Sequence, residues 1–428
     1  MGQHFGDPVK LNAYLNGKKS TGKPYLLTKN VSASIKAKDE LRNGLNTLFV
    51  AGSGVNPDKA LVLPNLLQAN MSYIVTDPGL DLYSKTKNKL IDEGYDIQTI
   101  SLDGSGDSVI NMFDYFKTDD DIYRIIGLLI SAVNATKIQD PFWNCACVDI
   151  VSAIVKYMKD NLSEEEQNCS TLWKLIQGMK PDMTGSTDQL FSSIPQGLAR
   201  KYSGYFNVST SPQTRASTLL IINACLKGLT GWSSVMDSKK NKKTVSLQQI
   251  FKKKTCIFVD PGTSLSAVWY DALILLLSQG SFERADDLNW ESVYKLQVYV
   301  TADFMISFNL FDSYLSKARC RNISYTVIGK DSQTFAKMCS EYKCALFDFI
   351  LLEGPISENT AIFIRDLIFK KGLDISFEKD LKYDDYADPK RKIDPVLLQK
   401  MKSGDAFLLA EGFKPVFDKK LTLKEKKS

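Results

Sequence analysis

The stretch NTLFVAGSGVNPDKALVLPNLL, residues Asn46–Leu67, decides the fold that we expect of this chain. Its apolar residues Leu48–Val50 predict a buried strand, and the Gly-Ser-Gly sequence after them predicts a tight turn. A helical pattern follows and leads to the phrase PNLL. Strand, glycine-containing turn and helix in this order form the frame in which backbone N–H groups can hold a phosphate. The frame predicts an α/β domain.

Further short apolar runs alternate with helical patterns along the chain. The runs are rich in Val, Ile, Phe and Tyr and end in turn or polar residues, which is typical of buried parallel strands. Helical patterns lie between them at 121–133, 149–159 and 311–318. This alternation predicts an α/β fold with a mostly parallel sheet. The strand-like runs are NTLFVAG, SYIVTDP, TCIFVDP, KLQVYVTADF and ISYTVIG, and the last strand-like phrase is GDAFLLAEGFKP.

The segment from about residue 161 to residue 231 differs because it has helical periodicity with few strand signals. A basic stretch follows, with Lys239, Lys240, Lys242, Lys243 and then Lys252–Lys254. Such a run is either a solvated surface or a contact for DNA or another anion. The predicted organisation is an N-terminal approach segment at 1–45, a discontinuous sheet domain at 46–160 and 250–417, an all-helical insertion with a basic linker at 161–249, and a Lys-rich tail at 418–428.

Composition narrows the possible functions. The net charge of +5 mildly favours an acidic partner such as DNA, although a modest excess of Lys is also typical of a solvated surface. The 8 cysteines are scattered without a CxxC pair, which disfavours zinc or disulfides and fits a reducing compartment. The one histidine, His4, leaves Ser-His-Asp, Cys-His and His-metal chemistry without an imidazole.

No part of the sequence predicts a membrane span. The N-terminus begins with the polar residues MGQHFGDPVK and has no signal-peptide pattern. The longest apolar runs, at 267–280 and 122–133, are shorter than the ~20 residues that a spanning helix needs, and both carry charges. We therefore expect buried helices and a cytoplasmic location.

Several phrases, in their order along the chain, resemble a known family. They are AGSGVNPD, LPNLLQANMSYIVTDP, GLDLY, DPFWNCACVDIVSAIVKYM, SPQTRASTLLIINACL, TADFMISFNLFDSYLSKARCRNISYTVIGKDSQ and GDAFLLAEGFKPV. Over about residues 46–417 they resemble the soluble part of VirD4/TraG-type coupling proteins, the hexameric ATPases of conjugative type IV secretion. The resemblance implies a RecA-like P-loop NTPase fold with an inserted all-helical domain. The family normally has a membrane anchor, so we expect an anchorless relative, peripheral to the inner face of the membrane at most.

The residues that would hold the phosphates depart from the family pattern. A working P-loop needs consecutive backbone N–H groups, a Lys for the β- and γ-phosphates and a Ser or Thr for Mg²⁺. Aligned on GSG and PNLL, the Gly-Lys-Thr positions are Asn56, Pro57 and Asp58. Pro57 has no amide hydrogen, and Asp58 places a carboxylate where a helix N-terminus would attract phosphate. The degenerate phosphate loop comprises Gly52, Ser53, Gly54, Asn56, Pro57, Asp58 and Lys59.

The same three residues also begin a helix well without any nucleotide. Asn is a good N-cap, Pro suits the first helical position and Asp suits the first turn. Lys59 lies two residues beyond the required lysine, about 200° around the helix, and should not replace it. The lost lysine contact alone forfeits roughly 1.5–3 kcal/mol. We therefore expect no tight ATP binding, with the carboxylate of Asp58 in the anion site.

Other motor positions implied by the resemblance are changed as well. The Asp-Glu pair of the second motif strand is Ala302 and Asp303, so the magnesium-side carboxylate is lost. Asp303, the candidate water-activating residue, is one methylene shorter than the Glu it replaces. The Lys-Gly-Glu triplet of the family phrase DPKGE is Gly-Leu-Asp at 79–81.

The resemblance also marks sensor and interface positions. The first sensor-like Gln is Gly329, while Gln333 remains. Arg319 and Arg321 match an Arg-Ser-Arg segment that lies near the subunit interface in the family. Alternatively, the two arginines are the basic end of a helix and satisfy its last carbonyls. The sensor or interface candidates are therefore Asp77, Arg319, Arg321 and Gln333.

Loss at four separate nucleotide-contacting motifs, with the surrounding strands retained, predicts a pseudo-ATPase. We expect a binding or structural component of a type IV secretion or DNA-transfer apparatus that needs no cofactor and co-assembles with an active homologue or presents substrate. One alternative is a divergent DNA-translocating ATPase that uses Lys59 and Asp303 with ATP and Mg²⁺. Another is a nucleic-acid-binding module without motor activity. Because no nucleotide would close a ring, we expect a monomer or a weak oligomer.

Overall fold

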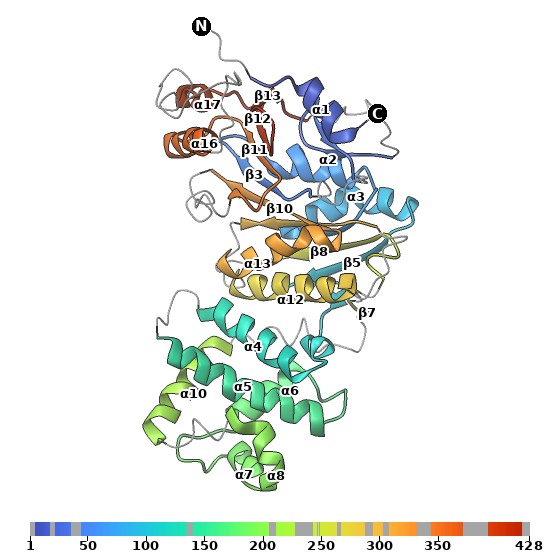
Figure 1. Ribbon diagram of the computed structural model, residues 1–428. Helices are drawn as coiled ribbons and strands as arrows, with labels where there is room; N and C mark the ends of the chain where they lie inside the picture. The colour runs from blue at the N-terminus through green and yellow to red at the C-terminus, as the bar shows by residue number, and fades with distance from the viewer. Residues whose placement is uncertain are drawn as a thin grey trace.

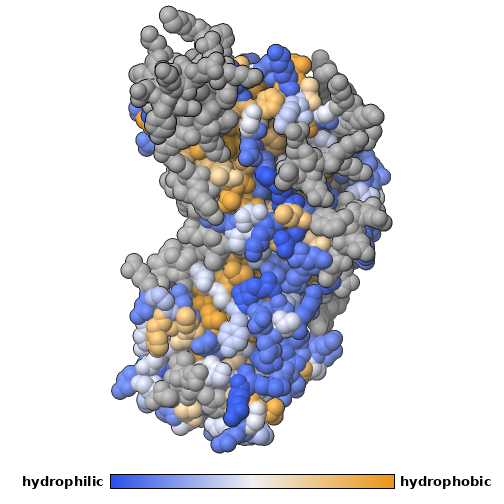
Figure 2. All heavy atoms as spheres, viewed as in Figure 1, coloured by the Kyte–Doolittle hydropathy of each residue, from blue (hydrophilic) through white to orange (hydrophobic). Residues whose placement is uncertain are grey.

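The chain forms two lobes joined at a waist. The structure, a computed structural model, describes residues 5–17, 22–35, 44–134, 140–204, 211–226, 243–245, 247, 249–262, 267–286, 294–302, 308–331, 344–370 and 393–421. The sheet lobe lies above the helical lobe in Figure 1, and the helical lobe consists of the helices between residues 119 and 226. Figure 2 shows the waist on one side of the molecule, with apolar residues gathered near it.

The sheet lobe is built on a nine-stranded sheet of order β13-β12-β11-β3-β10-β9-β4-β8-β5. The seven strands from β11 to β5 run parallel, and β12 and β13 are antiparallel additions at one edge. The predicted α/β fold with a mostly parallel sheet is therefore confirmed. The strands are β3 (Thr47–Ala51), β4 (Ser72–Thr76), β5 (Asp96–Ser101), β8 (Thr255–Asp260), β9 (Leu296–Thr301), β10 (Ile323–Lys330), β11 (Phe349–Glu353), β12 (Asp405–Ala410) and β13 (Val416–Lys419).

Each of the five strand-like runs predicted from the sequence forms a strand of this sheet. The strand β3, which precedes the Gly-Ser-Gly loop, lies between β11 and β10 in the sheet. The next strand beyond β10 is β9. Of the seven parallel strands, β5 and β11 were not predicted. The sequence of β5, DIQTIS, is too polar to stand out as a buried run, yet its last four residues are buried because the strand pairs with β8.

Helices cover both faces of the sheet, and alternate residues of β3 enter two separate cores. Leu48 and Val50 belong to the core that includes α12, α13 and α16, whereas Phe49 and Ala51 belong to the core that includes α1, α2 and α3. This is the period-two alternation of a strand buried on both faces. These helices are α1 (Pro8–Asn16), α2 (Leu63–Leu66), α3 (Asp81–Asp92), α12 (Ala267–Asp286), α13 (Phe308–Ala318) and α16 (Glu358–Lys370).

Short elements complete the sheet lobe. The strands β1 (Tyr25–Leu26) and β2 (Ser32–Ala33) pair with each other, as do β6 (Ser108–Val109) and β7 (Lys243–Thr244). No helix in the described part of the chain is long and apolar enough to cross a bilayer. The remaining pieces of this lobe are the π-helical turn η2 (Asp58–Val62), the 3-10 turns η3 (Pro78–Leu80), η4 (Met112–Tyr115) and η8 (Arg319–Arg321), and the helix α17 (Pro395–Gln399). The 3-10 turn η5 (Arg200–Tyr202) belongs to the helical lobe, where it contacts α5 and α8.

The helical lobe is centred on the long helix α5 (Pro141–Asn161), which packs against α4, α6 and α10. The boundary predicted at residue 161 therefore separates α5 from the helices that it contacts. Sequence patterning could not place this boundary, because one continuous hydrophobic core runs from the sheet through α12 and α4 into the helical lobe. The other helices are α4 (Asp119–Asn134), α6 (Cys169–Gln177), α7 (Ser186–Ser192), α8 (Gln196–Ala199) and α10 (Pro212–Leu226).

A fully buried ion pair fixes the lower end of this lobe. The guanidinium of Arg215, in α10, contacts the carboxylate of Asp188, in α7, and both side chains have no exposed surface. Arg215 Nε also donates to the carbonyl oxygen of Lys180 at 2.7 Å. Asp188 accepts two backbone N–H groups, from Lys180 at 2.8 Å and from Gly185 at 3.0 Å. Arg215 of the phrase SPQTRAS thus has a structural role in this chain.

We predict that Arg215→Met lowers the free energy of unfolding by about 3–5 kcal/mol, because it leaves the buried charge of Asp188 without its cation. The matched control in the same helix is Leu220→Ala, at a position 72% exposed, which should change the value by less than about 0.5 kcal/mol. Urea unfolding followed by circular dichroism measures both. The pair Arg215→Met with Asp188→Leu should recover most of the loss, and equal small effects of Arg215→Met and Leu220→Ala would contradict the prediction.

Candidate functional site

The loop after β3 directs its first backbone N–H groups toward its own chain. Gly52 N–H donates to the carbonyl oxygen of Glu353 at 2.8 Å, and Ser53 N–H donates to that of Pro355 at 3.1 Å. Val55 N–H closes the turn on the carbonyl oxygen of Gly52 at 3.2 Å. A phosphate needs these donors to converge on a ligand. Here three of them are occupied by backbone carbonyls.

The glycines of the loop serve this close packing. A Cβ atom on Gly52 would lie 2.3 Å from the carbonyl oxygen of Pro355 and 2.8 Å from that of Glu353, so no larger residue fits. Gly54 has a φ of +75°, the left-handed conformation that glycine adopts without strain. The Gly-Ser-Gly sequence is therefore explained by the fit of the turn against the end of β11.

The helix after the loop begins on its own cap. Asn56 Oδ1 accepts the backbone N–H of Lys59 at 3.0 Å, which confirms the predicted cap. Pro57 has helical φ and ψ angles of −64° and −32°. The first turn is π-helical, with Leu63 N–H donating to the carbonyl oxygen of Asp58, and it ends at Val62, two residues before Pro64. Proline has no N–H and its ring crowds the carbonyl four residues earlier, which favours a widened turn here.

Asp58 does not face the cavity that lies beside the loop. That cavity is lined by residues of the loop, of the end of β10 and of the segment after β11, and Asp58 is not one of them. Its carboxyl is partly buried near Asp81 and Asp77: burial raises the pKa of Asp58, the charge of Asp81 raises it further, and Lys85 lowers it. The expectation that this carboxylate fills the phosphate position therefore differs from the structure. The sequence predicted that Asp58 lies in the first helical turn but not where its side chain points. The first turn is π-helical, and its side chains therefore point in other directions than those of an α-helical turn.

A cavity of about 530 Å³ lies beside the loop, at the carboxyl ends of β3, β10 and β11. Such ends are where open α/β sheets bind ligands. Within the described part of the chain, Lys330 is the one cationic side chain that lines it, and Lys59 is not among its lining residues. The lining consists of Ala51, Gly52, Ser53, Gly54, Val55, Lys330, Asp331, Pro355, Ile356 and Ser357.

A second helix N-terminus at this cavity is also capped from within the chain. The carboxylate of Asp331 accepts the backbone N–H of Ser357, the hydroxyl of Ser357 at 3.1 Å and the hydroxyl of Thr360 at 2.5 Å. These groups lie at the start of α16, where an anion would otherwise be favoured. Asp331 was not predicted as a site residue. Its one sequence signal is its place directly after the strand β10.

Asp77 holds a turn together. It follows β4 and is buried, and its carboxylate accepts the backbone N–H groups of Leu82 at 2.9 Å and Tyr83 at 2.7 Å, at the start of α3. Burial raises the pKa of Asp77 to about 6, although these hydrogen bonds lower it. Asp260, the last residue of β8, similarly accepts the N–H groups of Gly79 at 3.2 Å and Gly262 at 3.0 Å. The similar phrases VTDPG, at 75–79, and FVDPG, at 258–262, thus form one connected pair of turns.

The remaining motor positions that the structure describes, Ala302 and Gly329, offer little chemistry. Ala302 is buried directly after β9. Gly329 lies inside β10, opposite Val50, and has no side chain to reach a ligand. Asp303 and Gln333 lie outside the described residues.

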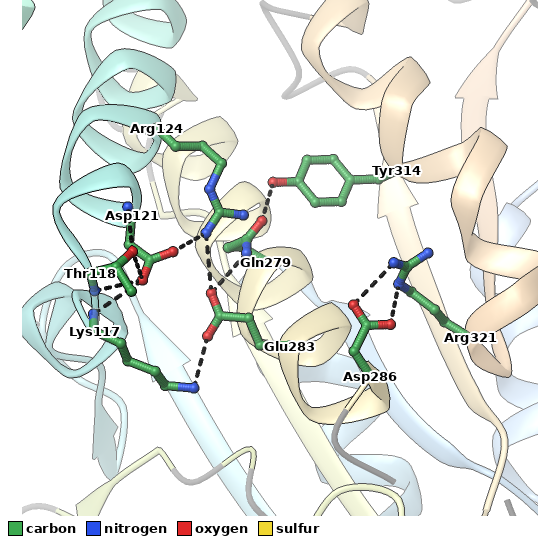
Figure 3. A network of polar contacts seen from close by, with 9 residues as sticks. All are labelled: Lys117, Thr118, Asp121, Arg124, Gln279, Glu283, Asp286, Tyr314 and Arg321. Carbon is green, nitrogen blue, oxygen red and sulfur yellow. Dashed lines mark hydrogen bonds and ion pairs between the residues drawn. The ribbon is translucent and has the colours of Figure 1, made fainter. Parts of the chain in front are cut away.

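The two candidate interface arginines are held by carboxylates of their own chain. Arg319 pairs with Asp348, which directly precedes β11, so it lies at the opposite end of that strand from the loop. Arg321 Nε lies 2.9 Å from Asp286 Oδ1, and its guanidinium stacks over the ring of Phe282 at 5.0 Å. Figure 3 shows the Arg321–Asp286 pair at the end of α12.

A polar network that the sequence did not reveal joins α4 to α12 and α13 (Figure 3). Glu283 is its centre: Gln279 Nε2 donates to it at 2.8 Å, and Lys117 and Arg124 pair with it at 3.4 and 3.5 Å. The hydroxyl of Tyr314 donates to Gln279 at 3.2 Å. Because Lys117 and Arg124 are well exposed, each pair contributes little energy, but together they orient the waist.

The phrase PNLLQAN is structural in this chain. The buried side chain of Asn65 accepts the N–H of Leu26 at 2.8 Å and donates to its carbonyl oxygen at 2.9 Å. Asn70 donates to the carbonyl oxygen of Lys23 at 2.7 Å and accepts the hydroxyl of Tyr73 at 2.8 Å. Both amides tie the segment at 23–26 to residues 65–70, so this phrase has a structural role in the chain.

Comparison with known proteins identifies the scaffold. The family described as Type IV secretory system Conjugative DNA transfer matches residues 10–299. No curated protein sequence matches the chain significantly.

Solved structures agree in fold. The plasmid coupling protein TrwB in complex with the ATP analogue ADPNP superposes with a TM-score of 0.69 at 12% identity, over 99% of this chain and 94% of that one. The unbound coupling protein TrwBdeltaN70 has a TM-score of 0.67 at 13% identity, over 98% and 92%. VirB4 of Thermoanaerobacter pseudethanolicus has a TM-score of 0.56 at 15% identity, over 96% and 98%. The chain therefore has the RecA-like P-loop fold and belongs to the type IV secretory system conjugative DNA transfer family, that of the VirD4/TraG-type coupling proteins.

Proposed function

We propose that this chain is a pseudo-ATPase of a type IV secretion or conjugative DNA-transfer apparatus, a binding or structural component that does not hydrolyse ATP. The observation that supports it most directly is the orientation of the loop amides. Gly52 and Ser53 donate to the carbonyl oxygens of Glu353 and Pro355, on the end of the neighbouring strand β11. A nucleotide would have to break both bonds before it could use either donor.

The charges beside the loop support the same proposal. The lysine of a working P-loop is replaced by Pro57, and its loss removes roughly 1.5–3 kcal/mol of charge-assisted hydrogen bonding. Since each 1.4 kcal/mol is a factor of ten, affinity for ATP falls by about one to two powers of ten from this change alone. Asn56 and Asp331 cap the two nearby helix starts. TrwB binds ADP and Mg²⁺ with the same fold, so the fold itself does not prevent binding.

The proposed setting is the cytoplasm, peripheral to the inner face of the membrane, with other components of the apparatus as partners. The chain acts there either alongside an active homologue or by presenting substrate through the helical lobe. Arg319 and Arg321 are retained at a family interface position, but their pairs with Asp348 and Asp286 stabilise the single chain. We propose a monomer or a weak oligomer, because a ring that binds no nucleotide between its subunits loses one source of cohesion.

The described lysines give a DNA-binding module little support. Of the run at 252–254, Lys254 lies 3.7 Å from the carboxylate of Glu93 and 5.5 Å from the centre of the Tyr95 ring. Only Lys252 and Lys253 of this run are exposed. With Lys243, which is also exposed, the described part of the basic stretch has three exposed lysines, whereas Lys239, Lys240 and Lys242 lie outside the described residues. Three exposed lysines make a weak electrostatic footprint compared with a protein that makes six to ten phosphate contacts.

We predict no saturable binding of a fluorescent ATP analogue with Mg²⁺ in the micromolar range, and no ATP turnover above background. Fluorescence titration and phosphate release measure the two quantities. Lys330→Ala and Lys59→Ala test the two lysines nearest the loop, and neither should change the result because neither holds a triphosphate. Micromolar binding, or turnover that Lys59→Ala abolishes, would instead establish the divergent active ATPase.

We also predict weak DNA binding that depends little on salt. Fluorescence anisotropy with a labelled duplex, between 50 and 200 mM NaCl, measures the slope of log affinity against log salt concentration. Lys252→Ala with Lys253→Ala should leave the slope unchanged within about one unit. A slope near −6 or steeper in the unmodified protein would favour the nucleic-acid-binding alternative.

A further inference from the structure

Glu353, the last residue of β11, is a buried acid among the described residues of the sheet lobe. Its side chain has no exposed surface. Neither Oε1 nor Oε2 has a hydrogen-bond partner within the described part of the chain. A carboxylate taken out of water without a partner is strongly disfavoured, so such a group either stays protonated or forces its surroundings to admit water.

The apolar surroundings of Glu353 follow from its register. Its neighbours across the sheet are Ala51 of β3 and Ala406 of β12, both buried and part of the same core as Leu351. Two alanines leave room for the carboxyl but offer no donor. Because side chains alternate along a strand, Glu353 points to the face that α1, α2 and α3 cover.

Few charges act on this carboxyl. Burial raises the pKa of Glu353 to about 7, and the positive charge of Lys420, beyond the end of β13, lowers it. The nearest charged residue of β12, Asp405, is engaged elsewhere, with Lys419 at 2.5 Å and the N–H of Lys402 at 2.9 Å. The residues paired with Glu353 on β3 and β12 are Ala51 and Ala406, which carry no charge. Lys420 is therefore the one described charge that acts on Glu353.

Glu353 also lies in the segment that holds the loop. Its carbonyl oxygen accepts Gly52 N–H at 2.8 Å, and that of Pro355, two residues later, accepts Ser53 N–H at 3.1 Å. The intervening Gly354 donates to the carbonyl oxygen of Asp405 at 3.1 Å. Gly52 approaches this segment so closely that a Cβ atom there would clash with it. Any shift of residues 353–355 toward water must therefore move the loop.

We propose that Glu353 is a proton-operated latch on the loop at 52–55. While its carboxyl is neutral, the end of β11 stays buried and the carbonyl oxygens of Glu353 and Pro355 hold the loop. When it ionises, the carboxylate draws water or the ammonium group of Lys420 toward it. The end of β11 then shifts and releases the N–H groups of Gly52 and Ser53. This inference does not depend on whether the chain binds nucleotide.

The direction of the pH effect follows from linkage. In the open form the carboxyl is in water and ionises near its ordinary pKa, about 4.5, whereas in the closed form its pKa is about 7. Between these values the closed form holds one more proton than the open form. The latch is thus tightest near pH 4.5 or below, loosens by at most about tenfold for each pH unit up to pH 7, and changes little above it.

Hydrogen exchange of the Gly52 and Ser53 amides tests this on the full chain, between pH 5 and pH 8 and corrected for intrinsic exchange rates. The protection factor should fall by about fortyfold from pH 5 to pH 7 and by only about a further twofold from pH 7 to pH 8. Glu353→Gln, which stays neutral, should keep high protection throughout. The matched control Glu411→Gln, at an exposed position, should keep the pH dependence of the unmodified protein.

Lys420→Gln gives a second test that needs no change at the latch itself. Removing this positive charge should move the levelling-off point to higher pH, whereas a purely structural role of Glu353 predicts no movement. Protection that does not vary with pH in the unmodified protein overturns the proposal, as does a pH dependence that persists in Glu353→Gln. Should Glu353→Gln fail to fold, the unmodified protein and Lys420→Gln decide the question between them.

Discussion

The conformation of the loop after β3 depends on two backbone hydrogen bonds, which Gly52 and Ser53 donate to the carbonyl oxygens of Glu353 and Pro355. A backbone N–H that donates to a carbonyl within the chain is not available to a phosphate. Parallel pairing sets Ala51 opposite Glu353, so the loop and the end of β11 leave the sheet at the same height. Their contact is a consequence of strand register, and it is maintained by the whole sheet.

The family resemblance survives where it stabilises the fold. Asn65 and Asn70 tie the helix after the loop to the segment at 23–26, and Asp77 holds the turn before α3. Each of these side chains satisfies buried or partly buried backbone groups, whose loss would destabilise any version of the scaffold. The positions that changed, Pro57 and Ala302 among them, have no such partners to lose. These phrases therefore have structural roles in this chain that involve no nucleotide contact.

The sequence predicted the parts of this structure that depend on local pattern. Apolar runs bounded by turn residues identified the central strands, and NPDK identified the capped helix start at Asn56. Prediction from the sequence failed where contacts between residues far apart in the chain determine the structure. The strand β5 is polar in sequence but is buried by pairing, and α5 belongs to the helical lobe because it packs against the helices there. The roles of Asp331 and Glu353 were invisible for the same reason, since their partners lie up to about 300 positions away in the chain.

The two lobes are more firmly joined than a hinge would require. A single hydrophobic core connects the sheet to the helical lobe through α12 and α4, and the network around Glu283 adds polar contacts at its rim. A core of this kind resists gradual deformation, because close-packed interiors have few voids to absorb movement. In a motor, nucleotide binding supplies the free energy to repack such a junction. The proposed absence of ATP hydrolysis fits this junction, because a component that only positions its partners needs no such input.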